Sequence, residues 1–183
     1  SGAAFQAVLR NPLADPYILG VSGGAALGAF LATAAGLQAL APALPLREAA
    51  AFLGAAATVG ALFLLSSVRG RILSYPMLLI GVIMNTVYLA VILLIETVVD
   101  FTRLHGVRLW MIGSIPIEGY GLISGLSVLL VLGVTGLSLC GRDLNLMSAG
   151  EDAARSLGVT VERTRLVTVL LASLITAAVV SVA

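Results

Sequence analysis

The sequence is poor in the charged and reactive side chains on which soluble enzymes rely. It has one cysteine, one histidine and no lysine, and only 10% of its 183 residues are charged. A soluble domain carries about 25% charged residues. Hydrophobic residues make up 60% of the chain, and its mean hydropathy is +1.11. The composition therefore predicts an integral membrane protein.

The missing residue types also exclude several kinds of site. A single cysteine, Cys140, cannot form an intrachain disulfide or a cysteine-based metal cluster. Without lysine there is no GxxxxGK[ST] loop, so this chain carries no Walker-type nucleotide site. We therefore expect no metal and no cofactor bound by this chain, and no nucleic-acid partner. If the protein uses ATP, a partner subunit binds it with Mg²⁺.

Apolar runs dominate the rest of the chain. A bilayer core about 30 Å thick needs roughly 20 apolar helical residues. Residues 1–9 have the character of the end of one more helix. We expect an all-α polytopic membrane bundle of about five full transmembrane helices plus the end of a sixth. Residues 1–183 would form one partial transmembrane domain, which lacks helices at both ends. The five runs are 17–40, 49–68, 72–99, 120–140 and about 164–183.

The arginines divide unequally between the two sides of such a bundle. Seven fall on one side and three on the other, which predicts that the first side is cytoplasmic. The turn at 11–16 and the segment 141–163 are then cytoplasmic, and the loops 41–48 and 100–119 face outward. The seven are Arg10, Arg69, Arg71, Arg142, Arg155, Arg163 and Arg165, and the three are Arg47, Arg103 and Arg108.

The outward segment 100–119 mixes charged and apolar residues. This pattern predicts a short helix lying at the membrane interface, with Trp110 at the depth of the headgroups. Arg103 and Arg108 either interact with solvent on a surface loop or meet acidic groups on an external partner. His105 is expected to be an interfacial residue rather than a metal ligand.

The inward segment between two membrane spans contains a further helix signature. Ser148 and Glu151 form S-x-x-E, the pattern of a capping box. The helix is expected to run from about 149 to 157, with Gly158 as its stop. Membrane insertion does not require such a short, capped helix, so it needs a functional reason.

The beginning of the first full run shows a different pattern. Asp15 and Pro16 predict an N-cap and a first-turn proline. Gly20, Gly24 and Gly28 recur every four residues, which places them on one helix face and predicts close contact with another helix. We expect that partner to be the preceding helix.

The same stretch matches the G-x-S-x-G pattern of a serine nucleophile at Ser22. Catalysis would require a base within hydrogen-bonding reach. The only histidine, His105, is expected on the opposite side of the membrane. Close packing of Ser22 and Gly23 with the neighbouring glycines is therefore the favoured interpretation, and an intramembrane serine hydrolase remains the alternative.

Asn85 and Tyr88 are polar residues in the middle of an apolar run. Polar groups inside a membrane usually face a partner or a cavity. Two interpretations stay open, namely hydrogen bonding between helices and lining of a translocation path.

Three stretches together resemble permeases of the FecCD-like family, the membrane subunits of ABC importers for ferric siderophores, haem and cobalamin. SGAAFQAVLRNPLADPYILGVSGGAALGA resembles the junction of the family's second and third helices, RLWMIGSI its outer loop after the fifth helix, and LNLMSAGEDAARSLGV its cytoplasmic coupling segment after the sixth. The resemblance covers essentially the whole chain.

The resemblance implies a part of a ten-helix permease subunit in the bacterial inner membrane, paired as a homodimer. It implies no enzymatic activity of the subunit itself, because cytoplasmic ATP-binding subunits supply the energy and a periplasmic binding protein delivers the substrate. Segment 143–163 would couple to the ATPase, segment 100–119 would be periplasmic, and Asn85 and Tyr88 would be pathway candidates. A secondary transporter without an ATPase is a further alternative. The coupling candidates are Ser148, Gly150, Glu151, Asp152, Ala153, Ala154, Arg155, Leu157 and Gly158, and the candidates for docking the binding protein are Arg47, Arg103 and Arg108.

Overall fold

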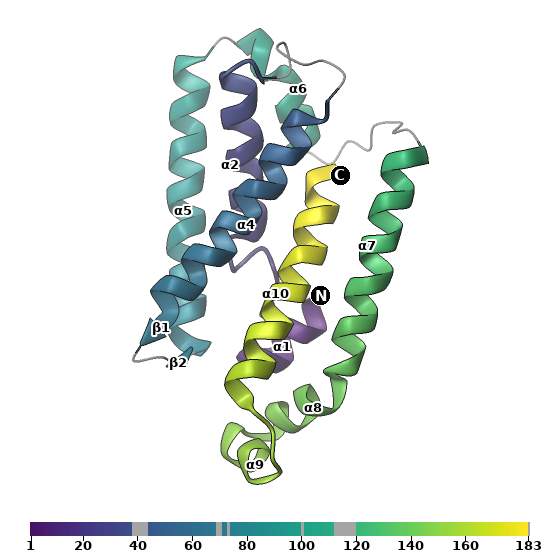
Figure 1. Cartoon of the computed structure of the whole chain (residues 1–183). Helices are drawn as coiled ribbons and strands as arrows, with labels where there is room; N and C mark the ends of the chain where they lie inside the picture. Colours follow the sequence, from purple (N-terminus) through teal and green to yellow (C-terminus); the bar gives the residue numbers. More distant parts are fainter. Residues whose placement is uncertain (38–43, 69–70, 73, 100, 112–119, 183) are drawn as a thin grey trace.

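The computed structural model describes residues 1–37, 44–68, 71–72, 74–99, 101–111 and 120–182, which form a bundle of helices (Figure 1). The prediction of an all-α fold is confirmed. Four strand residues form only a short antiparallel ladder between two long helices. The elements are α1 Gly2–Leu9, α2 Val21–Ala34, α4 Leu46–Ser66, β1 Ser67–Val68, β2 Arg71–Ile72, α5 Ser74–Val98, α6 Phe101–Met111, α7 Tyr120–Leu139, α8 Gly141–Ala149, α9 Glu151–Ser156 and α10 Val161–Val182.

Fewer helices than predicted are long and apolar enough to cross a membrane. In the described part of the chain α4, α5 and α10 qualify, and the pair α7–α8, bent by 51°, would make a fourth. The helix α2 has 14 residues, so the predicted run 17–40 does not form one continuous span. Residues 38–43 of that run lie outside the described residues.

The helix α2 starts later than expected because residues 16–20 form turns. The Asp15 Oδ1 atom does accept a hydrogen bond from the Ile18 amide at 2.8 Å, but it closes a turn and does not cap a helix. The N-cap is instead Gly20, whose φ of +78° lies in the left-handed region that glycine tolerates best. The predicted N-cap at Asp15 is therefore wrong.

Gly24 and Gly28 of α2 pack against α4 rather than against α1, which corrects the expected partner, whereas Gly20 lies closest to Gly81 of α5. A Cβ atom added to Gly28 would overlap the backbone carbonyl of Ala50. One added to Gly24 would overlap Thr58 Oγ1, and one added to Gly54 would overlap the Gly24 carbonyl. The two helices therefore touch through their backbones, and any side chain at these positions would separate them.

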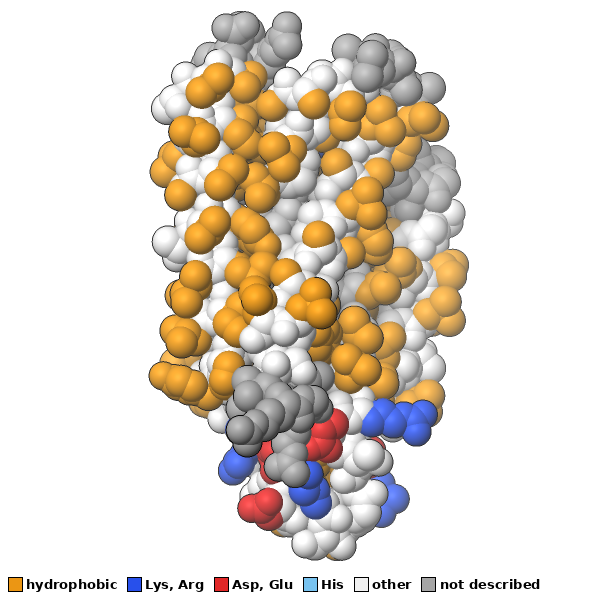
Figure 2. All heavy atoms as spheres, turned by 60° about the vertical axis from the view of Figure 1, so that its left-hand side comes forward, with side chains coloured by type: hydrophobic (Ala, Val, Ile, Leu, Met, Phe, Trp, Pro, Cys, Tyr) orange, Lys and Arg blue, Asp and Glu red, His pale blue; other side chains and the backbone are white. Residues whose placement is uncertain are grey.

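The helix α10 connects the main core with the end of the bundle where α8 and α9 lie (Figure 1). Its buried residues Val169, Ala172 and Ala177 belong to the main core together with residues of α1, α2 and α4. On the face seen in Figure 2, hydrophobic side chains cover the long helices, and charged side chains gather at the end formed by α8 and α9.

Candidate functional site

The segment between α7 and the body of α10 forms a compact unit at the charged end of the bundle, which we call the end module (residues 141–165). It consists of α8, α9 and the first turn of α10. Gly150, with φ +153°, separates α8 from α9. The chain thus reverses twice within about 25 residues and returns to the bundle.

The predicted capping box is not formed. Ser148 lies in the last turn of α8, where its Oγ atom donates a hydrogen bond to the Asn145 carbonyl at 2.7 Å. Glu151 is the first residue of α9, which has no side-chain cap, and its carboxylate pairs with an arginine of α10 instead. The helix is accordingly shorter than expected, Glu151–Ser156 instead of about 149–157.

The predicted stop at Gly158 is present and has the geometry of a Schellman motif. The Gly158 amide donates to the Arg155 carbonyl and the Val159 amide donates to the Ala154 carbonyl, both at 3.0 Å. The φ of Gly158 is +83°, which residues with a Cβ atom rarely adopt. The path from α9 into α10 is therefore fixed by the backbone.

A small apolar cluster lies beneath α9, separate from the main core. Its buried members are Met147, Ala154, Val159 and Val161. Ala154, one of the coupling candidates, is 0% exposed, so it packs inside the end module and not on its surface. On the outer face of α9, Asp152 and Ala153 are exposed, and Leu157 is 62% exposed.

Ion pairs join α9 to the first turns of α10. Arg165 of α10 is only 2% exposed and pairs with Glu151. Arg155 pairs with Glu162 of α10 at 2.6 Å and lies 4.0 Å from Glu151. A hydrogen bond of 3.2 Å from Thr164 Oγ1 to Asp143 Oδ2 adds a link from α10 to α8.

Sequence reasoning placed Arg165 among the cytoplasmic arginines and missed its burial. A usable pattern was present, because Arg165 lies four residues from both Val161 and Val169 and so shares their face of the helix. Both valines are fully buried. A basic residue on the apolar face of a helix is a reason to look for an acidic partner elsewhere in the chain.

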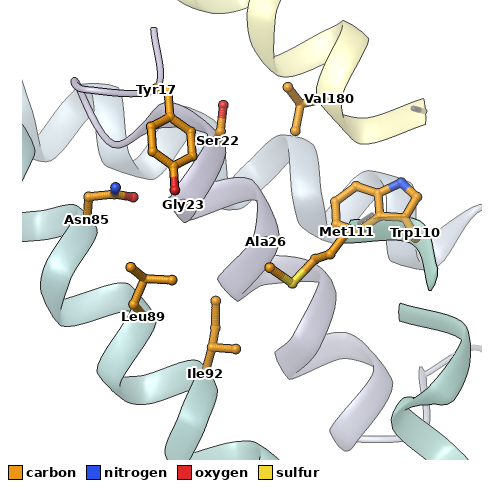
Figure 3. A pocket seen from close by; sticks show the side chains of 10 residues that line it. All are labelled: Tyr17, Ser22, Gly23, Ala26, Asn85, Leu89, Ile92, Trp110, Met111 and Val180. Carbon is orange, nitrogen blue, oxygen red and sulfur yellow. The ribbon is translucent and has the colours of Figure 1, made fainter. Parts of the chain in front are cut away.

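A second candidate site is a cavity of about 230 Å³ between α2, α5, α6 and α10 (Figure 3). Ser22 lines it, but none of the described lining residues is a histidine or a carboxylate, so the structure provides no base for a serine nucleophile there. The lining residues are Tyr17, Ser22, Gly23, Ala26, Asn85, Leu89, Ile92, Trp110, Met111 and Val180.

The two polar residues of α5 differ in their surroundings. The side chain of Asn85 faces α2, where a Cβ atom on Gly23 would overlap its Oδ1 atom. That Oδ1 atom is buried and has no hydrogen-bond partner among the described residues. The Tyr88 hydroxyl lies 2.9 Å from Thr58 Oγ1 on α4, which is a hydrogen bond between helices. Of these two residues, only Asn85 therefore brings an unsatisfied polar atom to the cavity, where the buried Trp110 Nε1 atom also has no hydrogen-bond partner among the described residues.

The opposite end of the bundle holds α6, where Trp110 packs inside the protein; its depth at the membrane headgroups stays a prediction. Trp110 is 5% exposed and lines the cavity. The Arg47 guanidinium lies 5.9 Å from its ring centroid and also pairs with Glu48 at 2.6 Å. Arg108 pairs with Glu96 at 2.8 Å. The side chain of Arg103 and residues 112–119 lie outside what the structure describes.

The family model that describes the FecCD transport family matches residues 1–183. This match covers the membrane helices and the end module alike. The chain belongs to the FecCD transport family. Within the described part of the chain there is no group of three or more histidine, cysteine or acidic residues placed to hold a metal ion.

Several proteins named as transport permeases are similar over the whole chain. The chain is 37% identical to the uncharacterized ABC transporter permease protein YvrB of Bacillus subtilis, covering 100% of this chain and 52% of that protein. It is 34% identical to the cobalamin import system permease protein BtuC of Halobacterium salinarum, covering 100% and 48%. It is also 34% identical to the hemin transport system permease protein HmuU of Yersinia pestis, covering 100% and 54%.

The fold has a solved counterpart. A structure described as an inward-facing conformation of a metal-chelate type ABC transporter matches with a TM-score of 0.84 at 28% identity, covering 99% of this chain and 57% of that one. The chain thus spans about half the length of the curated relatives it matches.

Proposed function

We propose that this chain belongs to the membrane permease subunit of an ABC importer that carries a ferric siderophore, haem or a corrinoid into the cell. The observation that carries the proposal is the FecCD match over the whole chain. Relatives that are similar over the full length of this chain are named as cobalamin and hemin permeases. The subunit would have no enzymatic activity of its own and would use ATP that a separate cytoplasmic subunit hydrolyses.

The end module would bind the ATPase subunit. It projects from the charged end of the bundle, and the outer face of α9 offers polar and apolar groups together. Asp152 and Arg155 would contribute charged contacts and Leu157 an apolar one. The remaining coupling candidates would act by determining the shape of the end module. Ala154 does so because it is buried, and Gly158 because it ends the helix. The other candidates are Ser148, Gly150, Glu151 and Ala153.

The path for the substrate would run beside α5 and a second, identical subunit. Asn85 is the stronger candidate, because it brings an unsatisfied polar atom to a cavity, whereas Tyr88 is engaged with Thr58. Transport would proceed by alternating access, in which packed helices take two arrangements that ATP binding and hydrolysis interconvert. A cysteine at position 85 should then react with a water-soluble reagent in at least one nucleotide state, and protection in every state would contradict the assignment.

The opposite end would receive a periplasmic binding protein. Arg47, Arg103 and Arg108 are the basic residues there. Arg47 and Arg108 already pair with carboxylates of this chain, so acidic groups of the binding protein would have to compete with Glu48 and Glu96.

The test is reconstitution of the full-length protein in liposomes with the ATPase and the periplasmic binding protein of the same transporter. We expect copurification with the ATPase and ATP-dependent uptake of one of the three substrate classes, and no uptake with an ATPase that cannot hydrolyse ATP. Uptake without ATP would favour a secondary transporter. A fluorophosphonate adduct on Ser22 would favour the hydrolase, and we expect no adduct.

A further inference from the structure

The end module raises a question that the proposed function does not answer, namely how movement of α9 reaches the membrane helices. α9 has six residues, too few to be stable without tertiary contacts. Apart from α8, the helix against which it packs is α10. We propose that Arg165 is a positioning residue, which holds α9 and α10 together so that they move as one body. The effect of this contact on transport rests on the proposed function, whereas the contact between α9 and α10 does not.

The burial of Arg165 is the first observation. It is the largest fully buried side chain of the described residues and carries a permanent positive charge. Removing a charge from water is unfavourable unless a partner compensates for the lost hydration. Apolar side chains of similar volume often stabilise such a position as well as a buried ion pair does, or better. What the buried arginine paired with Glu151 supplies in addition is a specific arrangement of α9 relative to α10.

The geometry of the ion pairs is the second observation. Glu151 stands at the first position of α9 and Arg155 one turn later. Their partners on α10, Arg165 and Glu162, are three residues apart and so lie on adjacent turns. The two pairs are opposite in sign, because α9 supplies the carboxylate in one and the guanidinium in the other. Together they define how α9 is rotated and where it lies against α10. A shift by one turn would place like charges opposite each other.

The continuation of α10 into the bundle is the third observation. Only four residues beyond Arg165, Val169 is fully buried in the main core, followed by Ala172 and Ala177. The hydrogen bond from Thr164 to Asp143 ties α8 to the same turn. A force applied to α9 would thus reach the centre of the bundle through α10, beside a second route through α8, whose Leu144 also belongs to the main core.

The test separates the contact from its consequence. The measurement uses the full-length protein with Cys140 replaced by alanine. Cysteines are introduced at the exposed positions Ser156, on α9, and Leu170, on α10, and each carries a spin label. Pulsed electron resonance then gives the distribution of distances between the two labels. We compare the parent with Arg165→Met, Arg165→Lys and Glu151→Gln, and use Arg163→Met as control, because Arg163 is an exposed arginine in the same turn.

We expect a narrow distribution in the parent and the control, a broad one in Arg165→Met and Glu151→Gln, and an intermediate one in Arg165→Lys, which keeps the charge but not the planar fork. In assembled transporters that bind the ATPase normally, substrate moved per ATP should fall about fivefold or more in Arg165→Met. A residue that only stabilises the fold would reduce the yield of assembled transporter and leave that ratio unchanged.

The possible results test the contact, the positioning role and the proposed function separately. An unchanged distance distribution in both Arg165→Met and Glu151→Gln would overturn the contact. A broadened distribution with an unchanged transport ratio would overturn the positioning role while leaving the contact intact. If the parent protein neither binds an ATPase nor transports, the proposed function fails, and the distance measurement still tests whether Arg165 holds α9 to α10.

Discussion

Two helix contacts in this chain are built in opposite ways. The contact between α2 and α4 depends on missing side chains, because Gly24, Gly28 and Gly54 let the two backbones touch. The contact between α9 and α10 depends on particular side chains, because Arg165 and Arg155 reach across to carboxylates. The first lies within the apolar bundle and the second at its charged end (Figures 1 and 2).

The difference follows from the surroundings of each contact. Helices that lie in lipid gain little from burying apolar surface, so close packing of small residues stabilises their association. A six-residue helix at the end of the bundle has few backbone contacts to offer, so ion pairs and a small apolar cluster hold it. The two contacts should therefore respond to different substitutions.

Replacing Glu151 by alanine should have the largest effect, since it leaves the guanidinium of Arg165 buried without that carboxylate. We expect the free energy of unfolding of the full-length protein to fall by about 3 kcal/mol. The control is Arg155→Ala, whose pair with Glu162 is 41% and 35% exposed and should contribute less than about 1 kcal/mol. Equal losses in the two variants, measured by denaturant unfolding in detergent, would show that burial does not distinguish the pairs.

Adding a single methyl group to the glycine contact should have the next largest effect. Gly28→Ala places a Cβ atom onto the Ala50 carbonyl, and backbone atoms cannot turn aside as a side chain can. We expect a loss of about 2 kcal/mol from overpacking. Gly60→Ala on α4 is the matched control, because nothing lies within 4 Å of a Cβ atom there. A loss in the control as large as in Gly28→Ala would mean that glycine itself, and not the contact, matters.

Gly158→Ala should have a moderate effect that is local to the end module. The φ of +83° disfavours any residue with a Cβ atom by about 1 kcal/mol. Gly141→Ala serves as control, since Gly141 has no positive φ and no close neighbour at its Cβ position. Hydrogen exchange should report faster opening of α9 in Gly158→Ala alone, and equal protection of α9 in both variants would contradict the expectation.

The smallest effect should come from the hydrogen bond between Tyr88 and Thr58. Interhelical hydrogen bonds in membrane proteins contribute about 0.6 kcal/mol on average. A double-mutant cycle of Tyr88→Phe and Thr58→Val should give a coupling of that order. A coupling close to zero would show that this hydrogen bond does not hold Tyr88. Tyr88 would then be as strong a candidate for the substrate path as Asn85.

Local features of this fold were predictable because they depend on neighbours in the sequence. The composition predicted membrane helices, the glycine spacing predicted a close helix contact, and Gly158 predicted the end of α9. The start of α2 was misjudged, because Asp15 and Pro16 form the same local pattern in a turn as at a helix N-terminus. The capping box failed for a similar reason, since Gly150 ends α8 between Ser148 and Glu151.

The sequence by itself determined the class of protein, the separation of its charges between two ends and the positions at which helices can approach or must end. Composition, periodicity and glycine are properties of short stretches and act wherever the chain folds. Only the tertiary structure decided that α4 is the partner of α2, that Ala154 and Arg165 are buried, and that Asn85 and Trp110 line one cavity. Apart from the packing of Ala154, whose partners lie nearby in the chain, those facts join residues that are 14 or more positions apart. The free energy that selects them arises from contacts that form only when the helices are assembled.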